Sequence, residues 1–428
     1  MKSAALSFDA LQEAVAKLPD GRLTASRHAA LEHLRQHGLP TTRNEDWKYT
    51  DLATIVDISN QSLERDGDHS QSQELERTIE SIRTTIAAYW LVIANGLIDD
   101  RSLAALDQTG ISITRLSESN GEIEHGAPLS DLNAALLHDG LRIHIDADVK
   151  LDRPIGILFV DDAASGPGMT QARVEIAMAA DSDASFIEYH TSLGSAKHYA
   201  NSVIKLDMDS NARIDYVRIQ ERARHHHQTG RLSVDVGRDS EFNHCAFDLG
   251  GELIRNDLAV NIAAPGSRSA FDGLYLVGDR QHIDNHTRAD HRVGPAESQQ
   301  EYRGILTGHS RGVWNGKAIV HAGADGTDAA QANHNLLLSD QAEIDAKPEL
   351  EIYADDVKCS HGTTIGQLDE TALFYLRTRG LNKHEAKQVL TRAFAHSIVS
   401  KSPIASIHDV LTAKIANRLN DLMQGADS

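Results

Sequence analysis

The chain is poor in cysteine, in aromatic residues and in long apolar runs, and each shortage excludes a class of protein. Only Cys245 and Cys359 occur in 428 residues, which excludes a disulfide framework and favours a reducing cytoplasm. No apolar run approaches the ~18 residues of a membrane-spanning helix, and no signal peptide is expected at the N-terminus. The net charge is -20, which argues against nucleic acid and anionic membranes as partners.

Three regions follow one another along the chain. Residues 1–125 are predicted to be an N-terminal helical and α+β region, because apolar residues recur at helical spacing near its start. Residues 126–365 are the predicted core, where short alternating runs rich in β-branched residues indicate strands. Residues 366–428 are predicted to be helical again, with Asn382 and Glu385 as a capping box.

Small polar turns separate the central strands at a nearly constant interval. Ser182, Ser210, Ser240 and Ser267 lie 28, 30 and 27 residues apart, an interval typical of solenoids. We therefore expect a mainly β fold, with a right-handed parallel β-helix as the core and helical regions on both sides. A β-sandwich is the alternative, but this length of strand would need two sandwiches, and no linker separates two halves.

Two histidine groups could bind a metal, but each has a simpler explanation. The run at 225–227 is expected to be a solvated turn or strand edge, since neighbouring strand side chains face opposite ways. A second group mixes imidazoles with carboxylates, as a cation site does. A polar ladder along the solenoid is the favoured interpretation of this second group, which comprises His282, Asp284, His286, Asp290 and His291.

Residues 312–318 are similar to a phosphate-binding loop, but they do not match its pattern. The spacing between the glycines is one residue short, and Ala318 cannot bind magnesium. The chain is therefore not expected to hydrolyse ATP.

Cys359 and His361 are the strongest candidate for chemistry. They lie two residues apart, so an extended strand would point both side chains to one face. Both are ligands for soft or borderline metals. Iron–sulfur clusters are usually held by four thiolates, which a chain with two cysteines cannot supply. Any metal chemistry here must use ligands from another chain. The alternative is a buried cysteine beside a histidine with no function.

The residues around this pair resemble a known family. The segments 355–364 and 373–380 closely resemble the SufB/SufD family of iron–sulfur cluster assembly proteins. Five further segments are similar to the family, namely 43–50, 282–287, 298–304, 335–340 and 348–352. SufB-type proteins carry a cysteine before the stretch 336–338 and an acidic residue near 359–361, and this chain has neither. Both differences favour the SufD branch.

The resemblance implies a fold, a function and partners. It implies a β-helix that pairs edge to edge with SufB, and a C-terminal helical domain that docks the ATPase SufC. The chain would be a non-ATPase scaffold subunit. His361, with Cys359 beside it, would help to build a transient iron–sulfur cluster at the SufB interface, and the chain alone would hold no cofactor. In isolation, the free solenoid edge favours a homodimer.

Part of the SufC contact is predicted in the C-terminal helices. Ile407, Val410, Leu411 and Phe394 are the candidates. The alternative is that they only pack the helices together, and we favour this alternative for Phe394.

Two rival functions remain. One is a metal-dependent, carbohydrate-active β-helix enzyme that uses His282, His286 and Asp290. Aromatic residues, which form sugar platforms, make up only 5% of the chain and disfavour this reading. The other is a purely structural subunit in which His361 is inert.

Overall fold

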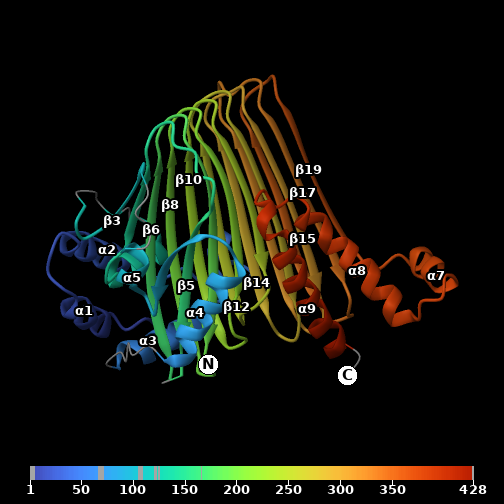
Figure 1. The fold of residues 1–428 in the computed structure, drawn as a ribbon, viewed down its shortest axis with the longest axis horizontal. Helices are drawn as coiled ribbons and strands as arrows, with labels where there is room; N and C mark the ends of the chain where they lie inside the picture. Colours follow the sequence, from blue (N-terminus) through green and yellow to red (C-terminus); the bar gives the residue numbers. More distant parts are fainter. Residues whose placement is uncertain are drawn as a thin grey trace.

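Two long, mainly parallel sheets dominate the computed structural model, which describes residues 5–65, 72–104, 109–119, 123, 126–164 and 166–426 (Figure 1). One sheet contains β1, β2 and the odd-numbered strands from β5 to β19. The other contains β3, β4 and the even-numbered strands from β6 to β18. Successive strands alternate between the sheets, so the chain winds as a flattened parallel solenoid. The predicted β-helix core with flanking helical regions is confirmed.

The odd-numbered sheet follows the order of the chain except at its first two strands. Its strands are β1 Tyr89–Ala94, β2 Leu97–Ile98, β5 Ile155–Asp162, β7 Asp183–Leu193, β9 Arg213–Glu221, β11 Glu241–Asp248, β13 Arg268–Val277, β15 Glu297–Leu306, β17 Asp328–Leu337 and β19 Lys358–Gly366. The even-numbered sheet comprises β3 Ile111–Arg115, β4 Leu141–Ile145, β6 Gly168–Met178, β8 His198–Met208, β10 His226–Val236, β12 Leu253–Ile262, β14 His282–His291, β16 Arg311–Val320 and β18 Glu343–Ile352.

The sheets begin before the predicted core. β1 pairs with β5 and β3 pairs with β4, so strands from the predicted N-terminal region belong to the solenoid. The predicted boundary at residue 125 itself lies outside the described residues. At the other end, β19 ends at Gly366, one residue beyond the predicted end of the core at residue 365.

The corner turns that join the even strands to the odd strands form a repeat, but its aligned positions are not all serines. Strand pairing aligns residue 182 with 212, 240 and 267, so Ser210 is outside the repeat and Ala212 takes the position. The residue before each of these positions has a positive φ, at Asp181, Asn211, Asp239 and Gly266. Asp, Asn and Gly tolerate this left-handed conformation better than other residues, so the left-handed residue defines the repeat.

Apolar side chains fill the space between the two sheets in the first coils. Ile157, Ile176, Ile204 and Ile214 are all buried there in one cluster. Inward and outward residues alternate along each strand, which explains the alternating sequence pattern. Burial of this continuous core stabilises the stacked coils.

Helices cover the outer faces of both sheets (Figure 1). The helical elements are α1 Phe8–Lys17, α2 Thr24–His37, η1 Glu45–Trp47, α3 Ala53–Leu63, α4 Gln73–Thr85, α5 Asp100–Ala104, α6 Pro128–Leu136, α7 Glu370–Thr378, α8 Lys383–Val399, η2 Ala405–Ile407 and α9 His408–Ala426. Helices α1, α2, α3 and α6 share a core with Tyr199 of the even sheet. The predicted capping box at Asn382 and Glu385 is confirmed at the start of α8. In the described part of the chain, no helix has the length and apolarity needed to cross a membrane.

The C-terminal helices pack on the outer face of the odd sheet. Ile398 of α8 and Leu411 of α9 lie in one cluster with Val217, Phe247 and Leu274 of the sheet. Leu411 has no exposed surface, so α9 is held by its apolar stripe.

This packing predicts that substitutions at two neighbouring positions of α9 change the free energy of unfolding by very different amounts. Leu411→Ala should lower the free energy of unfolding by about 2–5 kcal/mol, because it leaves a cavity against the sheet. Thr412→Ala, at the exposed neighbouring position, should change it by less than about 0.5 kcal/mol. Chemical denaturation of both variants measures the difference. Equal effects would mean that α9 is not packed on the sheet.

Candidate functional site

The last coil of the solenoid is open. Strands β18 and β19 are the terminal strands of their sheets, and among the described residues no strand pairs with their outer edges. Unpaired strand edges are templates for pairing with another chain, and proteins normally cover them. The open end is therefore the part of the solenoid best suited to contact another protein.

Cys359 and His361 lie on this terminal strand and face the inside of the last coil. Cys359 pairs in register with Ala329, and His361 with Gln331. Both β17 residues are buried inward-facing positions, and in-register neighbours of a parallel sheet share a face. Cys359 is half-buried and His361 is exposed. The structure therefore brings the two residues together at the open end of the solenoid between β18 and β19, which we call the mouth.

Strand β18 forms the opposite wall of this mouth. Its inward positions pair with buried Trp314 and Ala318 of β16 and carry apolar residues, including Ala346 and Leu350. The wall supplies no metal ligand from these positions. Among the described residues, no three His, Cys, Asp or Glu side chains form a group that could hold a metal. A cluster at the mouth needs ligands from a second chain.

The thiol of Cys359 is held in its protonated form. Partial burial raises the pKa of the Cys359 thiol, and the nearby Asp328 carboxylate raises it further, against a backbone hydrogen bond at Ala329 that lowers it. A thiol, unlike a thiolate, is a poor nucleophile and metal ligand. Cys359 therefore needs a metal ion or a partner group to displace its proton.

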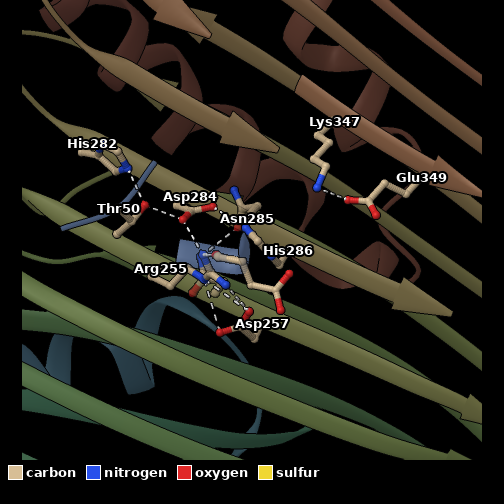
Figure 2. A network of polar contacts seen from close by, with 11 residues as sticks. Thr50, Arg255, Asp257, His282, Asp284, Asn285, His286, Lys347 and Glu349 are labelled. Carbon is tan, nitrogen blue, oxygen red and sulfur yellow. Dashed lines mark hydrogen bonds and ion pairs between the residues drawn. The ribbon is translucent and has the colours of Figure 1, made fainter. Parts of the chain in front are cut away.

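A second polar group lies on the outer face of the even sheet (Figure 2). The Arg255 guanidinium lies 2.6 Å from the Asp284 carboxylate and 2.8 Å from the Asp257 carboxylate. Thr50 donates a hydrogen bond to Asp284, and His282 lies 2.9 Å from the Thr50 hydroxyl. Arg255 and Asp284 are buried, so each charge is paired.

The charges of this network fix the ionisation of Asp284. Burial alone would raise the pKa of Asp284, but the Arg255 guanidinium and the neighbouring His286 outweigh burial and hold that pKa well below its usual range. The carboxylate thus stays ionised at neutral pH, and its positive partner is a guanidinium rather than a metal ion.

The contacts of this group favour the polar ladder over the cation site. His286 lies 3.1 Å from Asp284, and Arg288 lies 2.5 Å from Asp290, so these groups already have partners. His291 points into the solenoid, where it contacts Ser298 at 2.8 Å. Side-chain alternation along β14 puts His291 on the face opposite to the other four residues.

The polar segment 43–50, identified above only by its resemblance to the family, contacts the network directly. The backbone carbonyl of Asp46 accepts a hydrogen bond of 2.8 Å from Arg255, and the Trp47 ring lies 4.3 Å from the guanidinium carbon. Glu45 lies 2.7 Å from Lys347 of β18. Besides that resemblance, the segment carries two aromatic residues, Trp47 and Tyr49, among polar ones. The segment ties the N-terminal region to the last coils.

A groove of about 630 Å³ runs beside the network. Trp47, Asp257, His286 and Asp290 line it, which places two residues of the rival sugar-binding enzyme in a cavity. Trp47 is the sole aromatic residue lining this groove among the described residues, and its ring already covers Arg255. Both carboxylates are paired with arginines. The geometry does not favour that rival.

The predicted SufC contact needs correction. Ile407 and Leu411 are buried in the cluster with the odd sheet, because their helical stripe faces the solenoid. Phe394 and Val410 are half-buried and pack against the same cluster. The packing alternative therefore holds for Ile407 and Leu411, and it accounts for most of the surface of the other two.

Two exposed apolar side chains, by contrast, lie side by side in sequence on α7. Phe374 is 68% exposed and Tyr375 is 58% exposed. Figure 1 shows α7 projecting beyond the last strand, away from the solenoid. Exposed apolar residues on one projecting helix mark a surface that contacts another protein.

The buried ion pair between Arg255 and Asp284 is expected to contribute to the free energy of unfolding. Asp284→Ala leaves the Arg255 charge buried without this partner and should cost about 3–5 kcal/mol. Replacing the pair together, as Arg255→Met with Asp284→Leu, should recover most of that loss. Because the folded pKa of Asp284 is depressed, its stabilisation is full above the unfolded pKa of about 4 and fades as the pH falls below it. Denaturation at pH 7 and pH 3 tests both statements. A loss for Asp284→Ala that is equally large at both values would contradict them.

Comparison with known proteins agrees with this architecture. The chain matches the family model described as SUF system FeS cluster assembly, SufBD core domain, over residues 159–394, and the SufBD protein N-terminal region over residues 6–157. It is 28% identical to the iron–sulfur cluster assembly protein SufD of Escherichia coli over 397 residues, 91% of each chain. A SufBD family protein of Synechocystis is 27% identical over 95% of this chain and 93% of its own. SufD of Bacillus subtilis is 25% identical over 68% of this chain and 67% of its own. With both family models matched in succession, the chain belongs to the SufBD family of iron–sulfur cluster assembly proteins.

Proposed function

We propose that this chain is the SufD-type, non-ATPase scaffold subunit of an iron–sulfur assembly complex, and that its open end pairs with SufB. The observation that carries the proposal is the position of His361 and Cys359 on the inward face of the terminal strand. A partner strand added to that edge would enclose both side chains and supply the missing ligands. The two cysteines are free thiols, which fits a reducing compartment such as the cytoplasm.

The two side chains suit different steps of cluster assembly. Iron and sulfide are substrates here. The neutral imidazole of His361 binds iron through one ring nitrogen. Cys359 acts after it loses its proton. Its thiolate either binds iron, or attacks the outer sulfur of a donor persulfide and releases the donor as a thiolate. The SufB edge excludes water from the site and adds ligands.

The C-terminal helices would link this site to the ATPase SufC. In this proposal SufC docks on α7, and ATP-driven movement of SufC shifts α8. Arg303 of β15 lies with its guanidinium carbon 5.0 Å from the Phe394 ring of α8, and Lys401 lies 2.7 Å from Glu301 of β15. Strand β17 pairs with both β15 and β19. Movement of α8 is thereby transmitted across β17 to the strand that carries His361.

Because its end is open, we also expect this chain to associate with itself when SufB is absent. The same unpaired edges would join two copies of this chain when SufB is missing. The heterodimer is favoured when both chains are present, because SufB completes the ligand set.

The first test replaces the site residues within the complex. His361→Ala, expressed with SufB and SufC, should lower cluster formation by at least about 10-fold, since it removes an iron ligand. Ser360→Ala, at the outward position between the two, should leave cluster formation unchanged. Iron and sulfide analysis of the purified complexes measures both. Normal cluster content in His361→Ala would refute the proposed role.

The second test concerns SufC docking. Phe374→Asp should abolish co-purification of SufC, because it places a charge in the exposed apolar surface of α7. Thr371→Asp adds the same charge at an exposed position in the first turn of the same helix, where a negative charge is favourable, and should retain SufC. Retention of SufC by Phe374→Asp would exclude α7 as the docking surface.

A further inference from the structure

His361 is the last rung of a continuous ladder inside the odd sheet. Strand pairing puts seven inward positions in register across neighbouring strands, namely Phe186, Tyr216, His244, Phe271, Gln300, Gln331 and His361. The early rungs are rings that stack, as Phe186 and Tyr216 do at 6.3 Å. The two rungs next to His361 are glutamines. The ladder therefore changes from aromatic rings to amides at the two strands next to His361.

Gln331 is buried with its amide group unsatisfied. The side chain is only 4% exposed, and neither its Oε1 nor its Nε2 atom has a hydrogen-bond partner. A buried polar group without a partner costs about 1–3 kcal/mol. A leucine of similar size would avoid this cost, so the amide needs an explanation other than packing.

The polar neighbours of Gln331 on β15 and β17 each have at least one hydrogen-bond partner. Gln300 accepts a hydrogen bond of 2.7 Å from Thr287 through its Oε1 atom, while its Nε2 atom has no partner. Asn333 donates to the Tyr302 carbonyl at 3.1 Å and accepts from Asn335 at 2.5 Å. Ala329, on the other side along β17, has no polar side-chain atom. His361 is thus the neighbouring rung that has a ring nitrogen to offer.

We propose that Gln331 is a positioning residue for His361: its amide hydrogen-bonds one ring nitrogen of His361 and leaves the other nitrogen free to bind iron. The bond forms when the partner covers the open end and holds the exposed ring over the β17 rung. A hydrogen bond to one nitrogen fixes the tautomer and orientation of a ligating histidine. This inference rests on the proposed role of His361.

Few charged or titratable groups face the His361 ring, so the effect of a new charge at position 331 on this ring can be measured without interference from neighbours. The inward positions of β17 beside it carry Ala329 and Asn333, and those of β18 opposite carry apolar residues including Ala346 and Leu350. Cys359 is the titratable inward neighbour on β19. A carboxylate at position 331 would therefore be the one new charge next to the ring.

The test measures cluster formation against pH in the complex with SufB and SufC. Gln331→Leu should lower the rate about 10-fold, with complex composition and melting temperature retained. Gln331→Glu keeps an acceptor oxygen and should restore part of the rate. Its added negative charge favours the imidazolium form of His361, so the pH of half-maximal rate should move upward. Gln300→Leu, one rung deeper, is the matched control and should keep the wild-type rate and pH profile.

Two results would overturn the inference. One is a wild-type rate in Gln331→Leu. The other is an unchanged pH profile in Gln331→Glu, which would reduce Gln331 to a structural role even if Gln331→Leu were slow. If Gln331→Leu gave no intact complex, the pH profile of Gln331→Glu would decide alone. His361→Ala in the same assay separates the two proposals: full activity there refutes the proposed function, whereas its loss beside an active Gln331→Leu refutes this inference only.

Discussion

Each coil of this solenoid before the last satisfies its backbone by hydrogen bonding to the next coil, and among the described residues no further coil pairs with the last one. Strands β18 and β19 each end a parallel sheet with one edge unpaired among the described residues. An unsatisfied edge of this length favours association with another chain. The terminal rungs Cys359 and His361 are placed at that edge by the same register that builds the core. The fold and the candidate site are thus consequences of one stacking rule.

The architecture could be predicted from sequence patterns because each coil of a solenoid repeats the same strand and turn signals. Alternating apolar residues predicted strands, and the near-constant turn spacing predicted coils. The alignment at Ser210 failed because the corner is set by a left-handed backbone residue, which is Asn211 in this coil, and the position after it carries Ala212 in place of a serine. Residue type alone did not show which member of a polar turn has a positive φ.

The face that a helix buries was harder to predict. The apolar stripe with Ile407 and Leu411 was predicted to meet SufC, yet the odd sheet of the solenoid covers it. Periodicity shows that a stripe must be buried but not what buries it. The network around Arg255 and Asp284 was also missed in part, because Thr50 and Asp284 are 234 positions apart in sequence. Cys359 and His361 could be proposed from the sequence because their spacing, and their place at the end of the strand pattern, are both local signals.

The central claim is that β19 is a free edge that a partner strand completes. Hydrogen–deuterium exchange of the peptide 358–366 tests it most directly, with the chain alone at a concentration where it is monomeric and then in complex with SufB. Fast exchange in the monomer and strong protection in the complex are expected, while the peptide 282–291 in the middle of the solenoid stays protected in both. Equal exchange of 358–366 in the two states would contradict the account.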